Sequence, residues 1–178
     1  MKTIRRQLVF FGTCLVLAAC ASIPLGTLWK LRGFDEQTLV RLEPTDLRAA
    51  VALQPDVDVV PDSVRLSLEL QRTDAPPERH AFGLEPGTGP GPVHRGRRYS
   101  VWQLDDAGRK ALASVQRTLR AAGATEQGAY TGASFSVNFQ PELGDARPGA
   151  LQVSVQLLLA PEDGWLLLLD EANVPIRR

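Results

Sequence analysis

The chain has 178 residues, 44% of them hydrophobic, with 20 basic and 20 acidic side chains. Three of the basic residues stand within the first six positions, which leaves 17 basic against 20 acidic side chains in the rest. A net charge of about −3 on this remainder argues against general nucleic-acid binding. The 159 residues from position 20 onward fit one domain with a substantial core.

The first twenty residues have the organisation of an export signal. Basic residues at the start are followed by an apolar run, residues 8–17, and then by small residues that lead to Cys20. This run is too short to cross a bilayer, which needs about 20 apolar residues. The order predicts a cleaved signal peptide, residues 1–19, and not a membrane span.

Residues 17–20 (LAAC) resemble the lipobox of bacterial lipoproteins, with an ordinary secretory signal as the alternative. The resemblance implies that Cys20 receives a diacylglyceryl group, that the peptide is cut before it, and that the new amino end is acylated. Several acyl chains hold a protein stably on a bilayer. Ala21 and Ser22 stand where an aspartate tends to retain members of this family at the inner membrane. The resemblance therefore implies a lipid anchor in the outer membrane, with the domain facing the periplasm.

Cysteine usage limits the chemistry of the mature domain. Cys14 lies in the signal and Cys20 would carry lipid, which leaves residues 21–178 without a thiol. This excludes disulfides, a cysteine nucleophile and thiolate metal sites. Residues 20–26 form a lipidated tether that reaches about 20 Å at most. We therefore expect a single periplasmic domain, residues 27–178, close to the bilayer.

The segments between residues 27 and 84 alternate between strand and helix patterns. Residues 64–70 (VRLSLEL) predict the clearest strand, because every second residue is apolar. Residues 34–43 predict a short helix that Asp35 caps and Pro44 ends. Residues 46–53 are ambiguous, with a strand favoured over a helix. The remaining predictions here are a strand at 27–32, a loop at 55–62 and a short edge strand at 80–84.

One long helix is expected in the second half of the chain. Asp105 caps residues 106–122, in which Leu112, Val115, Leu119 and Ala122 form one apolar stripe. Before it, the Pro/Gly-rich residues 85–98 predict a mobile loop without ladder or helix, and residues 99–104 a strand.

The last strands are expected at residues 134–139, 151–159 and 165–169, the final two as a hairpin around residues 160–164. The run WLLLL within 165–169 predicts a strand covered on both faces. The fold class is α+β: a mostly antiparallel sheet of six to eight short strands with one long helix packed on it. A sandwich-like variant remains open.

No catalytic set is visible. The two histidines, His80 and His94, stand in or beside the Pro/Gly segment and are expected to be exposed loop residues. Glu78 and Glu85 could complete a metal cluster with them, but no fixed spacing enforces it. Adjacent carboxylates stand at a helix start, in a turn and at the end of a strand, which makes a cell-wall hydrolase the least favoured function. We predict no catalytic residue, no metal, no cofactor and no enzymatic activity.

A basic cluster on the loop is the first candidate binding feature. Its members are His94, Arg95, Arg97 and Arg98. They could meet anionic lipid headgroups or an acidic partner, while a solubilising loop tip is the plainer alternative.

Trp102 is the second candidate. It alternates with Tyr99 and Val101, so one of these two sides could be exposed beside the basic loop and contribute to a partner surface. The leading hypothesis is a non-enzymatic, membrane-anchored domain that binds a periplasmic protein or acts as a scaffold. The alternative is a carrier of an apolar ligand or lipid, with the helix covering a cavity of the sheet.

Overall fold

The computed structural model describes residues 36–72, 75–123, 130–144 and 149–176. Seven strands form one antiparallel sheet in the order β6-β3-β4-β5-β1-β8-β9, and β2 and β7 form a separate two-stranded ladder. The strands are β1 (Arg48–Leu53), β2 (Asp58–Val59), β3 (Arg65–Arg72), β4 (Glu78–Pro86), β5 (Ser100–Leu104), β6 (Tyr130–Asn138), β7 (Pro141–Glu142), β8 (Ala150–Leu158) and β9 (Trp165–Pro175).

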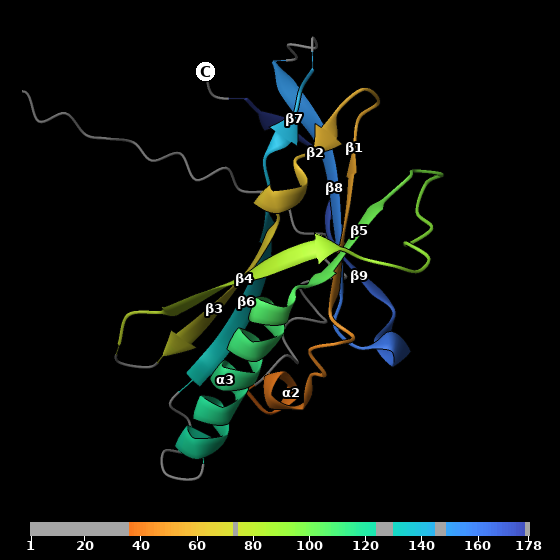
Figure 1. Ribbon diagram of the computed structural model, residues 1–178. Helices are drawn as coiled ribbons and strands as arrows, with labels where there is room; N and C mark the ends of the chain where they lie inside the picture. Colours follow the sequence, from red (N-terminus) through yellow and green to blue (C-terminus); the bar gives the residue numbers. More distant parts are fainter. Residues whose placement is uncertain (1–35, 73–74, 124–129, 145–148, 177–178) are drawn as a thin grey trace, which may run out of the picture.

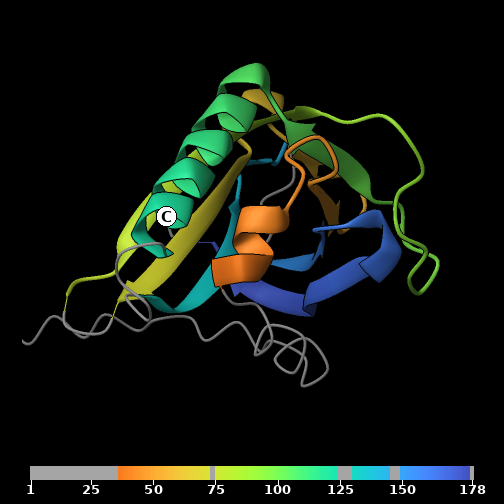
Figure 2. The ribbon, with the colours of Figure 1, turned by 90° about the horizontal axis from the view of Figure 1, so that it is seen from below.

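The sheet curls into a half-barrel, with the helices gathered on one side of it (Figure 1). The long helix α3 (Asp106–Gly123) lies along β4, and the short helix α2 (Glu36–Arg41) lies beside α3 (Figure 2). Two single-turn helices, η1 (Pro61–Ser63) and η2 (Pro161–Asp163), occupy connections. The class is therefore α+β with a mostly antiparallel sheet, as predicted. No sandwich-like arrangement is seen in the described part of the chain.

The inner face of the sheet carries the core. Leu66 and Leu68 of β3 pair in register with Phe82 and His80 of β4, which places these side chains on the same face. Leu112 and Leu119 of α3 are almost completely buried in the same cluster, at 0% and 1% exposure. Burial of side chains of this size stabilises the fold by about 2 kcal/mol each.

The first turn of α3 is fixed closely on β4. The Asp105 carboxylate accepts a hydrogen bond from the Gly108 backbone N–H at 2.6 Å, which confirms the predicted cap. A Cβ atom on Gly83 would lie 2.1 Å from Asp105 Oδ2, and one on Gly108 would lie 2.7 Å from the Gly83 carbonyl oxygen. The two glycines therefore permit a close approach of helix and strand at this end.

Most predicted elements are confirmed. They are the helices at 34–43 and 106–122, the strands at 46–53, 64–70, 99–104 and 134–139, and the hairpin of 151–159 with 165–169. The strand predicted at 27–32 lies outside the described residues.

Several predictions are wrong in position. The segment predicted as a short edge strand at 80–84 is β4, which has nine residues; it pairs with β5 only over Leu84–Pro86, so the edge position is confirmed for residues 80–83 and wrong for the strand as a whole. The predicted loop 85–98 begins within β4, because Glu85 pairs with Gln103 and Pro86 with Trp102. The predicted loop 55–62 contains β2, which pairs with β7, and the first two residues of η1.

The strand covered on both faces is β8 and not β9. Residues 153–158 of β8 are all buried, so both faces of this interior strand between β1 and β9 are covered. The run WLLLL stands at the sheet edge in β9 and is mostly half-buried. Among the described residues, no helix combines the length and the apolarity that a bilayer crossing requires.

Candidate binding cleft

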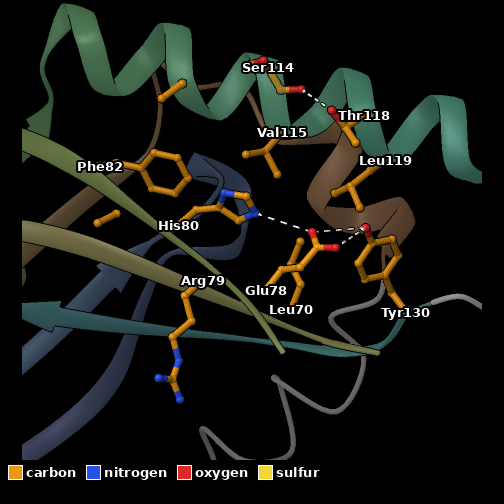
Figure 3. A pocket seen from close by; sticks show the side chains of 12 residues that line it. Leu70, Glu78, Arg79, His80, Phe82, Ser114, Val115, Thr118, Leu119 and Tyr130 are labelled. Atoms are coloured by element: carbon orange, nitrogen blue, oxygen red, sulfur yellow. Dashed lines mark hydrogen bonds and ion pairs between the residues drawn. The ribbon is translucent and has the colours of Figure 1, made fainter. Parts of the chain in front are cut away.

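A cleft of about 540 Å³ opens between the middle of α3 and the strands below it (Figure 3). Half of the twelve lining residues are polar or charged, and these come from α3 as well as from the strands. The lining residues are Leu70, Glu78, Arg79, His80, Ala81, Phe82, Ala111, Ser114, Val115, Thr118, Leu119 and Tyr130.

Helical periodicity explains the side of α3 that borders the cleft. Because a helix turns by about 100° per residue, positions 111, 114, 115 and 118 share one flank. Small uncharged residues and one valine occupy it, and we call these four residues the cleft flank. Small side chains near the mouth leave space that larger ones would fill.

A buried glutamine holds α2 on the other side of α3. Gln116 is 3% exposed, and its amide donates hydrogen bonds to the carbonyl oxygens of Leu39 and Leu42 at 3.0 and 2.7 Å. These carbonyls stand at the end of α2, where a helix lacks internal partners. Gln116 was not among the predicted functional residues, although a polar residue between two positions of an apolar stripe is a usable signal.

A polar cluster lies at one end of the cleft. Arg72 donates a hydrogen bond to Glu78 Oε1 at 2.7 Å, and its guanidinium carbon lies 5.4 Å from the ring centroid of Tyr130. The Tyr130 hydroxyl donates to the same carboxylate over longer distances, 3.4 and 3.5 Å. These contacts fix the Glu78 carboxylate at the cleft wall and compensate its charge.

His80 stands beside Glu78, because residues two apart on a strand face the same way. The His80 ring stacks on Phe82 with a centroid distance of 6.5 Å. Its Nε2 lies 3.9 Å from Glu78 Oε2 and makes no hydrogen bond. The prediction of an exposed loop histidine is therefore wrong for His80, which is a half-buried strand residue of the cleft.

His94 lies in a different part of the molecule from His80. It contacts Asp170, while Glu85 contacts Gln103 and Arg109, so the fold does not assemble the metal cluster considered from the sequence. No group of three or more metal-ligating side chains occurs within the described ranges.

The basic loop is bound to β9. His94 Nε2 lies 3.1 Å from Asp170 Oδ1, and Arg95 contacts both Asp170 and Glu171 at 3.2 and 3.3 Å. Arg97 donates to Glu171 at 2.9 Å and to the Gln152 amide oxygen at 2.6 Å. We call this group of contacts the loop clamp.

A β-bulge in β9 makes the loop clamp possible. Val153 of β8 pairs with Ala172 and Val155 pairs with Leu169, so Asp170 and Glu171 both stand opposite a single residue, Ser154. Glu171 has a φ of 48°, and its backbone N–H donates to the Ser154 hydroxyl at 3.0 Å. A bulge re-aims neighbouring side chains, and here two adjacent carboxylates contact the same loop.

The residues predicted to bind a partner therefore lie in different environments. His94, Arg95 and Arg97 are brought together, but by carboxylates of the same chain. Arg98 is exposed and lines a separate hollow of about 250 Å³ with residues 51–59 and Ser100. Cys20, the predicted lipid attachment residue, lies outside the described residues.

Trp102 is not a surface residue. It is 5% exposed and belongs to the main core cluster, which contradicts its predicted place in a partner surface. Its neighbour Ala49 in β1 faces the same interior. Tyr99 and Val101 are half-buried, so the side opposite Trp102 is the more exposed one.

One carboxylate near α3 has a shifted pKa. A hydrogen bond from Arg109 lowers the pKa of Asp106, and the positive charges of Arg109 and Lys110 add to the effect. Asp106 and Arg109 thereby form a neutral pair at the start of α3.

Comparison of the chain with models of known protein families, with characterised proteins and with solved structures gave no significant match.

Proposed function

We propose that the protein is a membrane-anchored envelope lipoprotein whose domain binds an apolar or amphipathic small ligand without catalysis. Cys20 would carry the anchor, in the outer membrane and facing the periplasm, and residues 27–178 would form the binding domain. The observation that carries the proposal is the cleft between α3 and β4.

The size and lining of the cleft support this function. Its volume of about 540 Å³ falls in the range of small-molecule sites, about 300–1,000 Å³. Val115, Ala81 and Ala111 offer accessible apolar contact area for a ligand body. The fixed carboxylate of Glu78 and the hydroxyl of Tyr130 offer hydrogen bonds that would orient a polar end.

A neutral, environment-sensitive dye such as N-phenyl-1-naphthylamine tests the proposal. We expect its fluorescence to rise with saturable, one-site binding to the folded protein. Thr118→Trp should fill the mouth of the cleft and weaken binding at least tenfold. Ala121→Trp, on an exposed position of α3 outside the lining, is the matched control and should leave binding unchanged. Equal binding by the two variants would place the dye elsewhere.

Protein binding is the second candidate function. Of the two end strands of the sheet, β6 is better suited than β9 to bind a partner. β6 pairs with β3 in unbroken register from Arg65 to Gln71 and contains neither a charged residue nor proline. β9 has two register shifts, two adjacent carboxylates and Pro175. A regular, uncharged edge can accept an added strand, whereas bulges and charges hinder it.

Photo-crosslinking in growing cells separates the two edges. A crosslinker at Ser136 of β6 should give one protein adduct, while the same group at Asn173 of β9 should give none. The adduct must then re-form from the two purified proteins. Adducts of equal yield from both edges would contradict strand addition at β6.

A further inference from the structure

The second flank of α3 concentrates positive charge. Between Asp106 and Gly123 the helix has four basic residues and one acidic residue. The turn of about 100° per residue places Lys110, Arg117 and Arg120 on the exposed side of α3 that adjoins the cleft flank, between it and the side that contacts α2. All three side chains are exposed. We call these three residues the basic flank.

No carboxylate of the described residues pairs with the basic flank, whereas Asp170 and Glu171 contact the basic residues of the loop clamp. Asp106, the only carboxylate of α3, is paired with Arg109. Within the described part of the chain, Lys110, Arg117 and Arg120 form no ion pair with a carboxylate. Arg120 donates a hydrogen bond to the Val40 carbonyl oxygen at 3.0 Å, which positions the guanidinium and leaves its charge intact.

The neighbouring helix α2 adds no positive charge. Glu36 and Arg41, its first and last residues, balance each other, and Glu43 follows with one negative charge. The positive potential of this side of the molecule therefore comes from α3.

We propose that the basic flank docks on the anionic headgroups of the membrane that carries the lipid anchor. The proposal rests on the anchor at Cys20 contained in the proposed function. Only fifteen residues separate Cys20 from Glu36, a reach of about 55 Å at most. Because α2 lies against α3, the basic flank is on the part of the fold that the chain enters first after the anchor.

Such a contact is strong enough to orient the domain on the membrane but too weak to attach the protein to it. Each basic residue near an anionic surface favours the docked state about fivefold at physiological salt. Three residues together favour it about a hundredfold, which is small beside a multiple acyl anchor. The anchor would hold the protein, and the basic flank would select one orientation. Since Lys110 and Ser114 are one turn apart, the mouth of the cleft would then open beside the bilayer.

The test uses the mature acylated protein in vesicles. Phosphatidylethanolamine vesicles with phosphatidylglycerol are compared with vesicles of phosphatidylcholine. The mature chain would have no thiol besides the acylated Cys20, so one introduced cysteine gives a single labelling site. A fluorophore at Ala121→Cys reports on the outer side of α3, and one at Ser136→Cys reports on β6. Headgroup nitroxides should quench the Ala121 label selectively, and only in the anionic vesicles.

Matched variants decide the outcome. Lys110→Gln with Arg117→Gln should lower the ratio of docked to undocked protein about 25-fold. Arg65→Gln with Arg98→Gln removes two exposed cations elsewhere and should change the ratio less than twofold. Flotation with the vesicles but without selective quenching would overturn docking and leave the anchor in place. Failure of the protein to float with any vesicle would overturn both proposals.

Discussion

The loop clamp and the basic flank both bring basic side chains together. In the loop clamp, carboxylates of the same chain contact these side chains, whereas the basic flank is exposed without such contacts from any described carboxylate. His94, Arg95 and Arg97 stand together in the sequence, yet Asp170 and Glu171 compensate them from a strand more than seventy residues away. Lys110, Arg117 and Arg120 are scattered in the sequence, yet one flank of α3 collects them. A dense run of basic residues is therefore a poorer guide to a charged surface than helical periodicity combined with the positions of the carboxylates.

The difference also separates stability from binding. Arg97 is only 18% exposed at its side chain, and both of its hydrogen-bond partners are fixed on neighbouring strands. Its contacts stabilise the loop against the sheet. Lys110 and Arg117 are solvated and contribute little to folding, so their charge is available to a partner surface.

Arg97→Ala should have the largest effect on stability among the variants that test this difference. It removes two charge-assisted hydrogen bonds and should lower the free energy of unfolding by about 2 kcal/mol. Arg117→Ala should change the same quantity by less than about 0.5 kcal/mol, since it lies on an exposed helix surface. Urea denaturation of both variants is the measurement. Equal losses would mean that the loop clamp contributes nothing beyond a surface ion pair.

Substitutions at Glu171 in the β9 bulge should have a second, smaller effect on stability. Glu171→Ala and Glu171→Gly both remove the carboxylate, but a φ of 48° suits glycine. The glycine variant should therefore be more stable than the alanine variant by about 1 kcal/mol. Thermal unfolding monitored by circular dichroism compares the pair. An alanine variant as stable as the glycine variant would show that the backbone relaxes at this position.

The smallest expected effect on stability comes from the pair of Asp106 and Arg109 at the start of α3. The Asp106 carboxyl should titrate below its ordinary pKa of 3.8, and Arg109→Gln should move the pKa back toward that value. Because the folded-state pKa is lowered, the stabilisation is present above the ordinary pKa and is lost as the pH falls through the lowered one. The exposed position keeps this contribution small. Carbon-detected NMR titration of the side-chain carboxyl measures both midpoints.

Much of the fold follows from local patterns. The alternation in 64–70 predicts β3, and Asp105 together with the stripe of Leu112 and Leu119 predicts α3 and its cap. These elements are predictable because the period of apolar residues and the capping side chain act within a few residues.

The cleft and the loop clamp depend on contacts that local patterns do not contain. His80 was predicted to be a loop residue because it stands beside the Pro/Gly segment, and its place in a strand follows from the pairing of β4 with β3. The position of β4 follows from its pairing with β3 over Glu78–Gly83 and with β5 over Leu84–Pro86. The clamping carboxylates stand in a bulge whose existence depends on the β8–β9 register. Trp102 was ambiguous since alternation identifies two faces and does not say which one is inside.

NMR mapping of a bound amphiphile is the most direct test of the central claim that the cleft beneath α3 is a binding site. A neutral eighteen-carbon alcohol, titrated into labelled protein, should shift the resonances of Ala111, Val115, Thr118 and Tyr130 and give intermolecular contacts to their side chains. Shifts confined to the loop clamp or to the outer face of β6, or no shifts at saturating ligand, would contradict the account.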